Sequence, residues 1–461
     1  MKKSLLFVIT LLSSGLYAQE HFSGISTSRR TGIINATINP AELVNLNNNY
    51  EVNVFTFSAN VANNKISFGD LVGGVDNFEE KLFSGVEPVN MRVDVEILGP
   101  SFAFKVEKWA FAITSAAKVR GNLVDIDTNL GSALTLDPIT SSLITANVNS
   151  SYNQRVSATS WGEIGFSAAR DFYETEEHKI SGGITFKLLF PGTYANISAD
   201  KFKGTVNIDT EVIIDNPEII NDRVYLTDAE ATLNLAYSGS LGEGFDNTSD
   251  FAKFFAGGLN GISTDIGFNY QWKDADYDNE GYKLNAGLSF RNLGSMKFKD
   301  ENNESKSYKL SVKGAEELDL TQFEDAEGFQ DFEAIFAANP QFFQIINTSK
   351  DFKVKTPALI SAYADYRVHR RWYATAYFQQ KLNKDGNNEQ IAVQNMISLT
   401  PRYSTGFFEV YAPLANNEIS GFTAGIGFRV GGFYIGSGSL LSAAISDTNQ
   451  ADAYLGFRFG F

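Results

Sequence analysis

The sequence predicts an all-β fold, namely a transmembrane β-barrel of the outer membrane. We expect about 14 strands, with about 16 as the alternative. Two observations favour this fold. Segments of about ten residues alternate large apolar side chains with small or polar ones, and aromatic residues stand near the ends of these segments. Proline is scarce, with 10 residues in a chain of 461, and aromatic residues make up 13% of the chain. Both features are typical of extended strands.

The chain opens with a segment typical of an export signal, residues 1–18. Lys2 and Lys3 precede a short apolar run, and small residues follow it up to Ala18. We therefore predict cleavage after Ala18 and export; a hydrophobic first strand is the less favoured alternative. Removing the two signal lysines would lower the formal net charge from −16 to −18. A chain this acidic is not expected to bind nucleic acid.

The clearest predicted hairpin covers residues 262–290, where each strand is about ten residues long, enough to cross a bilayer when tilted. One face of both strands is large and apolar: Ile262, Ile266, Phe268, Tyr270, Trp272, Tyr282, Leu284, Leu288 and Phe290. The other face is small or polar and poor in Lys and Glu. This favours a barrel lumen over the solvent face of a soluble sandwich. A soluble secreted β-protein remains the third alternative.

The last eight residues repeat this pattern at the carboxy-terminus. Leu455, Phe457, Phe459 and Phe461 share one face, and Tyr454 and Arg458 lie on the other. We expect the apolar face to contact lipid. Loop lengths also alternate along the chain, with long polar loops expected on the outer side at 121–150, 382–390 and 442–450, and a strand over 391–400.

Residues 50–461 therefore form one predicted barrel domain, and residues 19–49 differ from it in composition. This segment is polar, with Arg29 next to Arg30 and an Asn39-Pro40 step, yet it contains several isoleucines that need burial. We interpret it as an amino-terminal plug folded inside the barrel; a disordered leader is the alternative.

The longest predicted insertion between strands is 314–351, on the extracellular side. It is acidic between Glu316 and Glu333, and a helical spacing then places Phe329, Phe332 and Phe336 on one face. A solvated acidic loop with one helix packed on the rim is favoured. A lid, or a helix that docks a protein partner, is the alternative.

No pattern in the sequence indicates a catalytic site or a metal site. The three histidines, His21, His178 and His369, are far apart, whereas metal sites need clustered ligands. There is no cysteine for thiol catalysis, and no nucleophile elbow or phosphate-binding loop is present. We expect no catalytic residue, no metal site and no cofactor, and predict that the protein is not an enzyme.

One loop resembles the start of a calcium site. Asp274, Asp276 and Asp278 alternate, but Asn279 and Asn285 stand where such a loop needs Gly and Glu. A hydrated outer turn is the favoured interpretation of 274–280.

Several short motifs resemble a known family. "INPAEL" before the first strand and "LSFRNLGSMKF" at 288–298 look like the FadL-type outer-membrane barrels, and "EIGFSAARDFYETEEHKISGGITFKLL" at 163–189 is similar to an uncharacterised Bacteroidota branch related to PorV-like barrels. The terminal Phe461, with Tyr454, Phe457 and Phe459 before it, resembles the signal read by the barrel-assembly machinery.

The resemblance implies two functions. FadL-type members admit hydrophobic small molecules through a hatch-gated barrel, and Arg29, Arg30, Asn39 and Pro40 would lie in that hatch. PorV-like members are instead scaffold or shuttle subunits of the type 9 secretion system. We expect passive transport of small hydrophobic compounds, with the scaffold as the alternative. The partners expected are outer-membrane lipid, the assembly machinery during biogenesis, a hydrophobic small molecule and a protein bound at 314–351.

Overall fold

The computed structural model describes residues 21–461 except 74–77, 136–144, 213–219, 239–257, 274–280, 300–303, 324, 325, 327 and 446. The predicted export signal and the calcium-like loop 274–280 lie outside the described residues.

Among the described residues, a ring of 14 antiparallel strand positions confirms the predicted fold and strand number. In ring order the positions are β1 (Tyr50–Asn63), β2 with β3 (Val89–Leu98, Ser101–Val106), β4 (Trp109–Ile126), β6 (Asn153–Glu174), β7 (His178–Val212), β9 (Gly261–Lys273), β10 (Tyr282–Phe298), β15 (Leu359–His369), β16 (Trp372–Lys381), β17 (Met396–Ser404), β18 with β19 (Phe408–Tyr411, Leu414–Asn417), β20 with β21 (Gly421–Ala424, Ile426–Val430), β22 (Phe433–Ser437) and β23 (Gln450–Gly460). The ring closes because β1 pairs with both β2 and β23.

The outside of the ring carries a belt of exposed apolar side chains. It includes Trp109, Ile113, Phe166, Ile180, Ile184, Phe186, Ile266, Phe268, Trp272, Phe428, Phe457 and Phe459. Residues that alternate with them are buried and mostly small or polar, as the sequence predicts. Such a surface is stable only in lipid, so the ring spans a membrane. No helix in the described part of the chain is long and apolar enough to cross a bilayer.

The lipid-facing belt can be tested at Ile184, which is 49% exposed near the middle of the belt on β7. Ile184→Arg is expected to lower the free energy of unfolding from lipid vesicles by about 2–4 kcal/mol, because arginine is costly at the bilayer midplane. Val86→Arg, at an outer loop position already 95% exposed, is the control and should leave stability unchanged. Equal effects of the two substitutions would contradict a lipid-facing Ile184.

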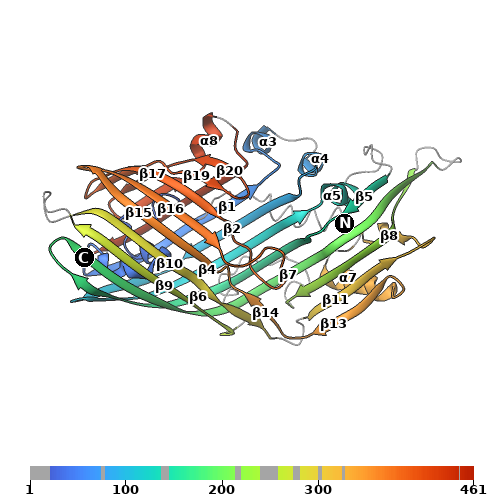
Figure 1. The fold of residues 1–461 in the computed structure, drawn as a ribbon, viewed down its shortest axis with the longest axis horizontal. Helices are drawn as coiled ribbons and strands as arrows, with labels where there is room; N and C mark the ends of the chain where they lie inside the picture. Colours follow the sequence, from blue (N-terminus) through green and yellow to red (C-terminus); the bar gives the residue numbers. More distant parts are fainter. Residues whose placement is uncertain are drawn as a thin grey trace.

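The two mouths of the barrel differ. The carboxy-terminal mouth carries short turns, whereas the opposite, outer mouth carries the helices α3 (Phe68–Gly73), α4 (Phe78–Leu82), α5 (Thr128–Thr135) and α8 (Leu440–Ile445) (Figure 1). Several strands run beyond the ring at the outer mouth. The 35-residue β7 pairs with β9 along its first part and with β8 (Ile220–Tyr237) along its second part.

We call this outer sheet the outer extension. Besides β8 it contains β5 (Thr145–Asn149), β11 (Glu304–Val312), β12 (Leu318–Asp319), β13 (Phe343–Ser349) and β14 (Phe352–Lys355), with η3 (Thr321–Phe323) and α7 (Phe329–Ala338). The expectation that 314–351 contains no strand is wrong, because β12 and β13 fall within it and pair with β8 and β11. Helix α7 packs its apolar face, including Phe332 and Phe336, onto this sheet.

The amino-terminal residues lie inside the ring. Helix α2 (Ile33–Ile38) and the 3₁₀ helix η1 (Pro40–Asn45) are almost wholly buried and pack against inward-facing residues of the wall near the carboxy-terminal mouth (Figure 1). We call residues 21–48 the plug. Small wall residues make room for it: a Cβ at Gly183 would lie 2.5 Å from the carbonyl carbon of Pro40, and one at Gly267 would overlap the Asn39 side chain.

Candidate functional site

The plug is anchored to the wall through one buried carboxylate, Glu42. Its oxygens accept hydrogen bonds from Asn269 Nδ2 (2.9 Å), Asn285 Nδ2 (2.8 Å), Asn45 Nδ2 (2.8 Å) and the Tyr363 hydroxyl. Three of these donors stand on β9, β10 and β15, three neighbouring strands of the wall. Hydrogen bonds to a charged group out of water are among the stronger ones in proteins. Glu42 is therefore the main polar fastening of the plug.

The four predicted hatch residues divide into two kinds. Asn39 is fully buried: its Nδ2 donates to the Phe268 carbonyl (2.9 Å) and the Tyr363 hydroxyl (3.2 Å), and its Oδ1 accepts from Ala41 N, which caps η1. Pro40 is the first residue of η1, a position that suits its fixed φ. Arg29 bonds to Asn47 at 3.2 Å, within the plug, and Arg30 N donates to Ser28 Oγ. The structure thus places Asn39 and Pro40 against the wall.

The predicted assembly residues lie on opposite faces of β23. Phe457, Phe459 and Phe461 are exposed on the outer face, whereas Tyr454 is buried in the lumen. The Tyr454 hydroxyl donates to the carbonyl of Ser23 in the plug (2.7 Å) and also lies at hydrogen-bond distance from the Tyr411 hydroxyl (2.8 Å). Tyr454 therefore holds the plug, and recognition of this strand by the assembly machinery stays a prediction.

Besides the plug, a loop from the outer mouth also folds into the lumen and helps to close it. Residues 382–395, which we call the inward loop, connect β16 to β17, and residues 390–394 are buried. The strand expected over 391–400 begins only at Met396. Before it, Gln390 forms a single bridge with Lys355 of β14, and carbonyls of the inward loop bond to arginines of the wall. Arg155 donates to Asn387 O (2.7 Å) and Gln390 O (3.2 Å), and Arg120 donates to Ala392 O (3.1 Å).

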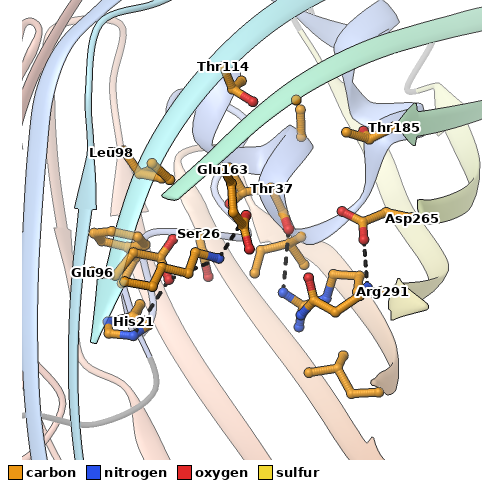
Figure 2. Close-up of a pocket in the computed structure, with 18 of the residues that line it drawn as sticks. His21, Ser26, Thr37, Glu96, Leu98, Thr114, Glu163, Thr185, Asp265 and Arg291 are labelled. Carbon is orange, nitrogen blue, oxygen red and sulfur yellow. Dashed lines mark hydrogen bonds and ion pairs between the residues drawn. The ribbon is translucent and has the colours of Figure 1, made fainter. Parts of the chain in front are cut away.

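A cavity of about 120 Å³ lies between the plug and the inward loop (Figure 2). Plug residues such as Ile33 and Thr37 form one side, and Val393 of the inward loop lies on another. In Figure 2 the acidic side chains Glu163 and Asp265 project into this space, and Arg291 reaches the Thr37 carbonyl of the plug.

Five neighbouring strands contribute a row of inward charges to the wall of this cavity, in the order Glu96, Lys118, Glu163, Lys187 and Asp265. Lys118 Nζ lies 3.6 Å from Glu96 Oε2 and 3.3 Å from Glu163 Oε2, and Lys187 Nζ lies 2.7 Å from Asp265 Oδ2. Each buried charge therefore has an opposite neighbour. This charge ladder makes the lumen suited to water and polar solutes, and costly for an apolar compound.

The plug also brings a histidine to the ladder. His21 Nε2 lies 3.5 Å from Glu96 Oε2, and Figure 2 shows the ring beside that carboxylate. Burial lowers the pKa of His21 from its usual value, against the opposing effect of Glu96. The other two histidines lie elsewhere, and the described residues contain no group of three His, Asp or Glu side chains able to hold a metal ion.

A larger and almost wholly apolar pocket, about 260 Å³, lies in the outer extension. It is on the outside of the wall. Val156, Ile197 and Leu235 line it. On β6, Val156 lies on the same face as Phe166, which is exposed in the lipid-facing belt. Phe83 of the segment after α4 and Phe332 of α7 cover these wall residues from outside.

The pocket stands just beyond the belt. On β4 the last exposed apolar side chain is Val119, and Leu123, four residues further out, already lines the pocket and is 7% exposed. Sequence reasoning missed both this pocket and the charge ladder. The outward apolar residues of the pocket have the same period-two pattern as lipid-facing ones, and the ladder depends on strand register.

A family model described as a family of unknown function, DUF5723, matches residues 40–438, from η1 of the plug to the end of β22. This chain belongs to the DUF5723 family. The match covers the wall from β1 to β22, the inward loop and the outer extension of this DUF5723 protein, and β23 lies beyond it.

Several solved structures are similar to the DUF5723 chain. They include the toluene transporters TbuX of Ralstonia pickettii (9% identity, TM-score 0.40, covering 97% of this chain and 98% of that one) and TodX of Pseudomonas putida (11%, 0.39, 96% and 99%). A TodX deltaS2S3 mutant, a monoaromatic hydrocarbon channel, is also similar (10%, 0.45, 92% and 94%). At sequence identities of 9–11%, the similarity to these structures is one of fold and carries no statement about function. No curated protein matches the DUF5723 chain.

Proposed function

We propose that this chain is a non-enzymatic outer-membrane barrel that binds small hydrophobic compounds and passes them inward without an energy source of its own. The observation that carries the proposal is the apolar pocket of the outer extension. A cavity of about 260 Å³ without charged lining exceeds the roughly 150 Å³ that accommodates benzene in an engineered protein core. A closed single-chain ring with an even strand number is typical of the bacterial outer membrane, and the predicted export signal agrees with that location.

Within this proposal the pocket is a capture site and the plug is a gate. Among the described residues, the plug, the inward loop and the charge ladder occupy the lumen between the two mouths. Passage would therefore require displacement of the plug. The scaffold alternative would use the helix of 314–351 to dock a protein partner, but the apolar face of that helix, α7, is packed against the outer extension.

Capture is tested by titrating an uncharged hydrophobic fluorophore, N-phenyl-1-naphthylamine, into the purified barrel in detergent. Phe332→Asp is expected to weaken binding on the order of tenfold or more, because it places a carboxylate at an apolar wall. Ile346→Asp, at a position 58% exposed on β13 and away from the pocket, is the matched control. Unchanged binding by the Phe332 variant, or equal loss in both variants, would contradict the capture site.

A further inference from the structure

A group of exposed lysines stands on the wall where β10 ends and where β14 pairs with it. We call this group the lysine patch; its members are Lys297, Lys299, Lys353 and Lys355. The whole chain is acidic, with a formal net charge of −16, so four cations gathered on one surface need a physical explanation.

The residues that alternate with the lysine patch fix the direction in which it points. They are apolar, buried and packed in one cluster: Met296, Phe298, Phe352 and Val354. The same cluster contains Ile391 of the inward loop, so it lies on the lumen side of the wall. Because successive strand residues point to opposite faces, the four lysines point outward, as the lipid-facing belt does.

Strand register places the lysine patch at the outer edge of the belt. Ile262 on β9, Ser295 on β10 and Lys355 on β14 form one row across three strands. Ile262 is 55% exposed and is the outermost apolar side chain of β9 on the lipid side. The next outward-facing row, with Lys297 opposite Lys353, lies about 7 Å further out. The lysines therefore begin where the apolar surface ends, which is the level of the lipid headgroups.

The lysine patch is not neutralised within the described part of the chain. Lys297 and Lys353 are direct cross-strand partners, and like charges in that position destabilise an antiparallel pair. None of the four lysines forms an ion pair with a described residue, whereas Lys306 and Lys381 each pair with two carboxylates. An anion supplied from outside the chain would remove the repulsion.

We propose that the lysine patch binds the phosphate of an anionic lipid in the leaflet at the outer mouth, with Lys297 and Lys353 on either side of the phosphate. Continuity with the belt favours a lipid as the source, because acyl chains lying on Ile262 and Leu293 would place their headgroup at this level. A phosphate monoester carries about 1.5 to 2 negative charges, which matches two opposed ammonium groups. This inference goes beyond the proposed hydrophobic capture and does not depend on it.

The test is native mass spectrometry of the purified full-length barrel in detergent, titrated separately with dioleoyl phosphatidic acid and dioleoyl phosphatidylcholine. The two lipids have the same acyl chains and differ in headgroup charge. Phosphatidic acid is expected to bind on the order of tenfold more tightly than phosphatidylcholine. The double variant Lys297→Gln/Lys353→Gln should weaken phosphatidic acid binding by about tenfold or more, because each lysine near an anionic headgroup contributes to the attraction.

Lys309→Gln/Lys313→Gln is the matched control for charge. Both lysines are exposed, and they lie on and just after β11, which pairs with β8 and β13 of the outer extension and not with a strand of the ring. This double variant removes the same charge away from the belt and should bind phosphatidic acid as the unsubstituted barrel does.

Three outcomes would overturn the inference. Equal binding of the two lipids would mean that the headgroup charge is not recognised, and equal loss in the two double variants would assign the effect to net charge. Displacement of phosphatidic acid by millimolar inorganic phosphate would make the patch a site for free phosphate. Folding is checked by heat-modifiable migration on a denaturing gel. If the Lys297/Lys353 double variant does not fold, Lys353→Gln alone decides, with Lys309→Gln as its control.

Discussion

Glu42→Ala is expected to raise the permeability of proteoliposomes to small solutes on the order of 100-fold. The substitution leaves the donors of Asn269, Asn285 and Tyr363 buried without the carboxylate that now accepts their hydrogen bonds. Charged hydrogen bonds contribute about 1.5–3 kcal/mol each, so a loss of roughly 3 kcal/mol in plug seating is a conservative expectation. Since about 1.4 kcal/mol is a factor of ten in an equilibrium, the unseated population would rise about 100-fold.

Two companion proteins make this experiment decisive. Deletion of residues 22–45 removes the plug and sets the upper limit of flux, while Glu107→Ala, in the exposed β3–β4 turn, should leave flux at the level of the unsubstituted barrel. Flux of the Glu42 variant equal to that of the Glu107 variant would mean that the plug does not gate the lumen. A deletion variant that stays closed would assign the closure to the inward loop instead.

Arg402→Met should lower the free energy of unfolding by about 3–5 kcal/mol, the cost of removing one partner from a buried ion pair. Arg402 is 2% exposed, and its Nη2 lies 2.5 Å from Asp365 Oδ2 and its Nε 3.4 Å from Glu409 Oε1. Both carboxylates are fully buried on the lumen side of the wall. Without Arg402, Asp365 keeps only the hydroxyls of Tyr282 and Thr375, which carry no charge.

The measurement is urea unfolding of the barrel in lipid vesicles, followed by heat-modifiable migration. Arg223→Met is the matched control, because Arg223 pairs with Glu317 at 2.8 Å but both side chains are more than 40% exposed. An exposed pair contributes little to stability, so that variant should unfold as the unsubstituted protein does. If the Arg402→Met variant were as stable as the control, solvent would have to reach Asp365 and Glu409 in the lumen.

The sequence by itself determined the wall of this protein. Period-two alternation in segments such as 262–272 and 454–461 decides which side chains face lipid and which face the lumen, because successive strand residues point to opposite faces. Strands that face lipid must close into a ring, because an open sheet would leave unpaired backbone groups at its edges. The apolar residues within the polar amino-terminal segment indicate that this segment is buried.

Only the tertiary structure decided the contents and the cover of the barrel. Lys118 and Glu163 become partners through strand register, and Glu42 meets Tyr363 across 321 residues of chain. Alternation also could not distinguish Val156 and Leu235, covered by Phe83 and α7, from Phe166, which meets lipid. Spacing along one strand fixes the face on which a side chain lies; what lies opposite that face is fixed by long-range pairing, which no local pattern encodes.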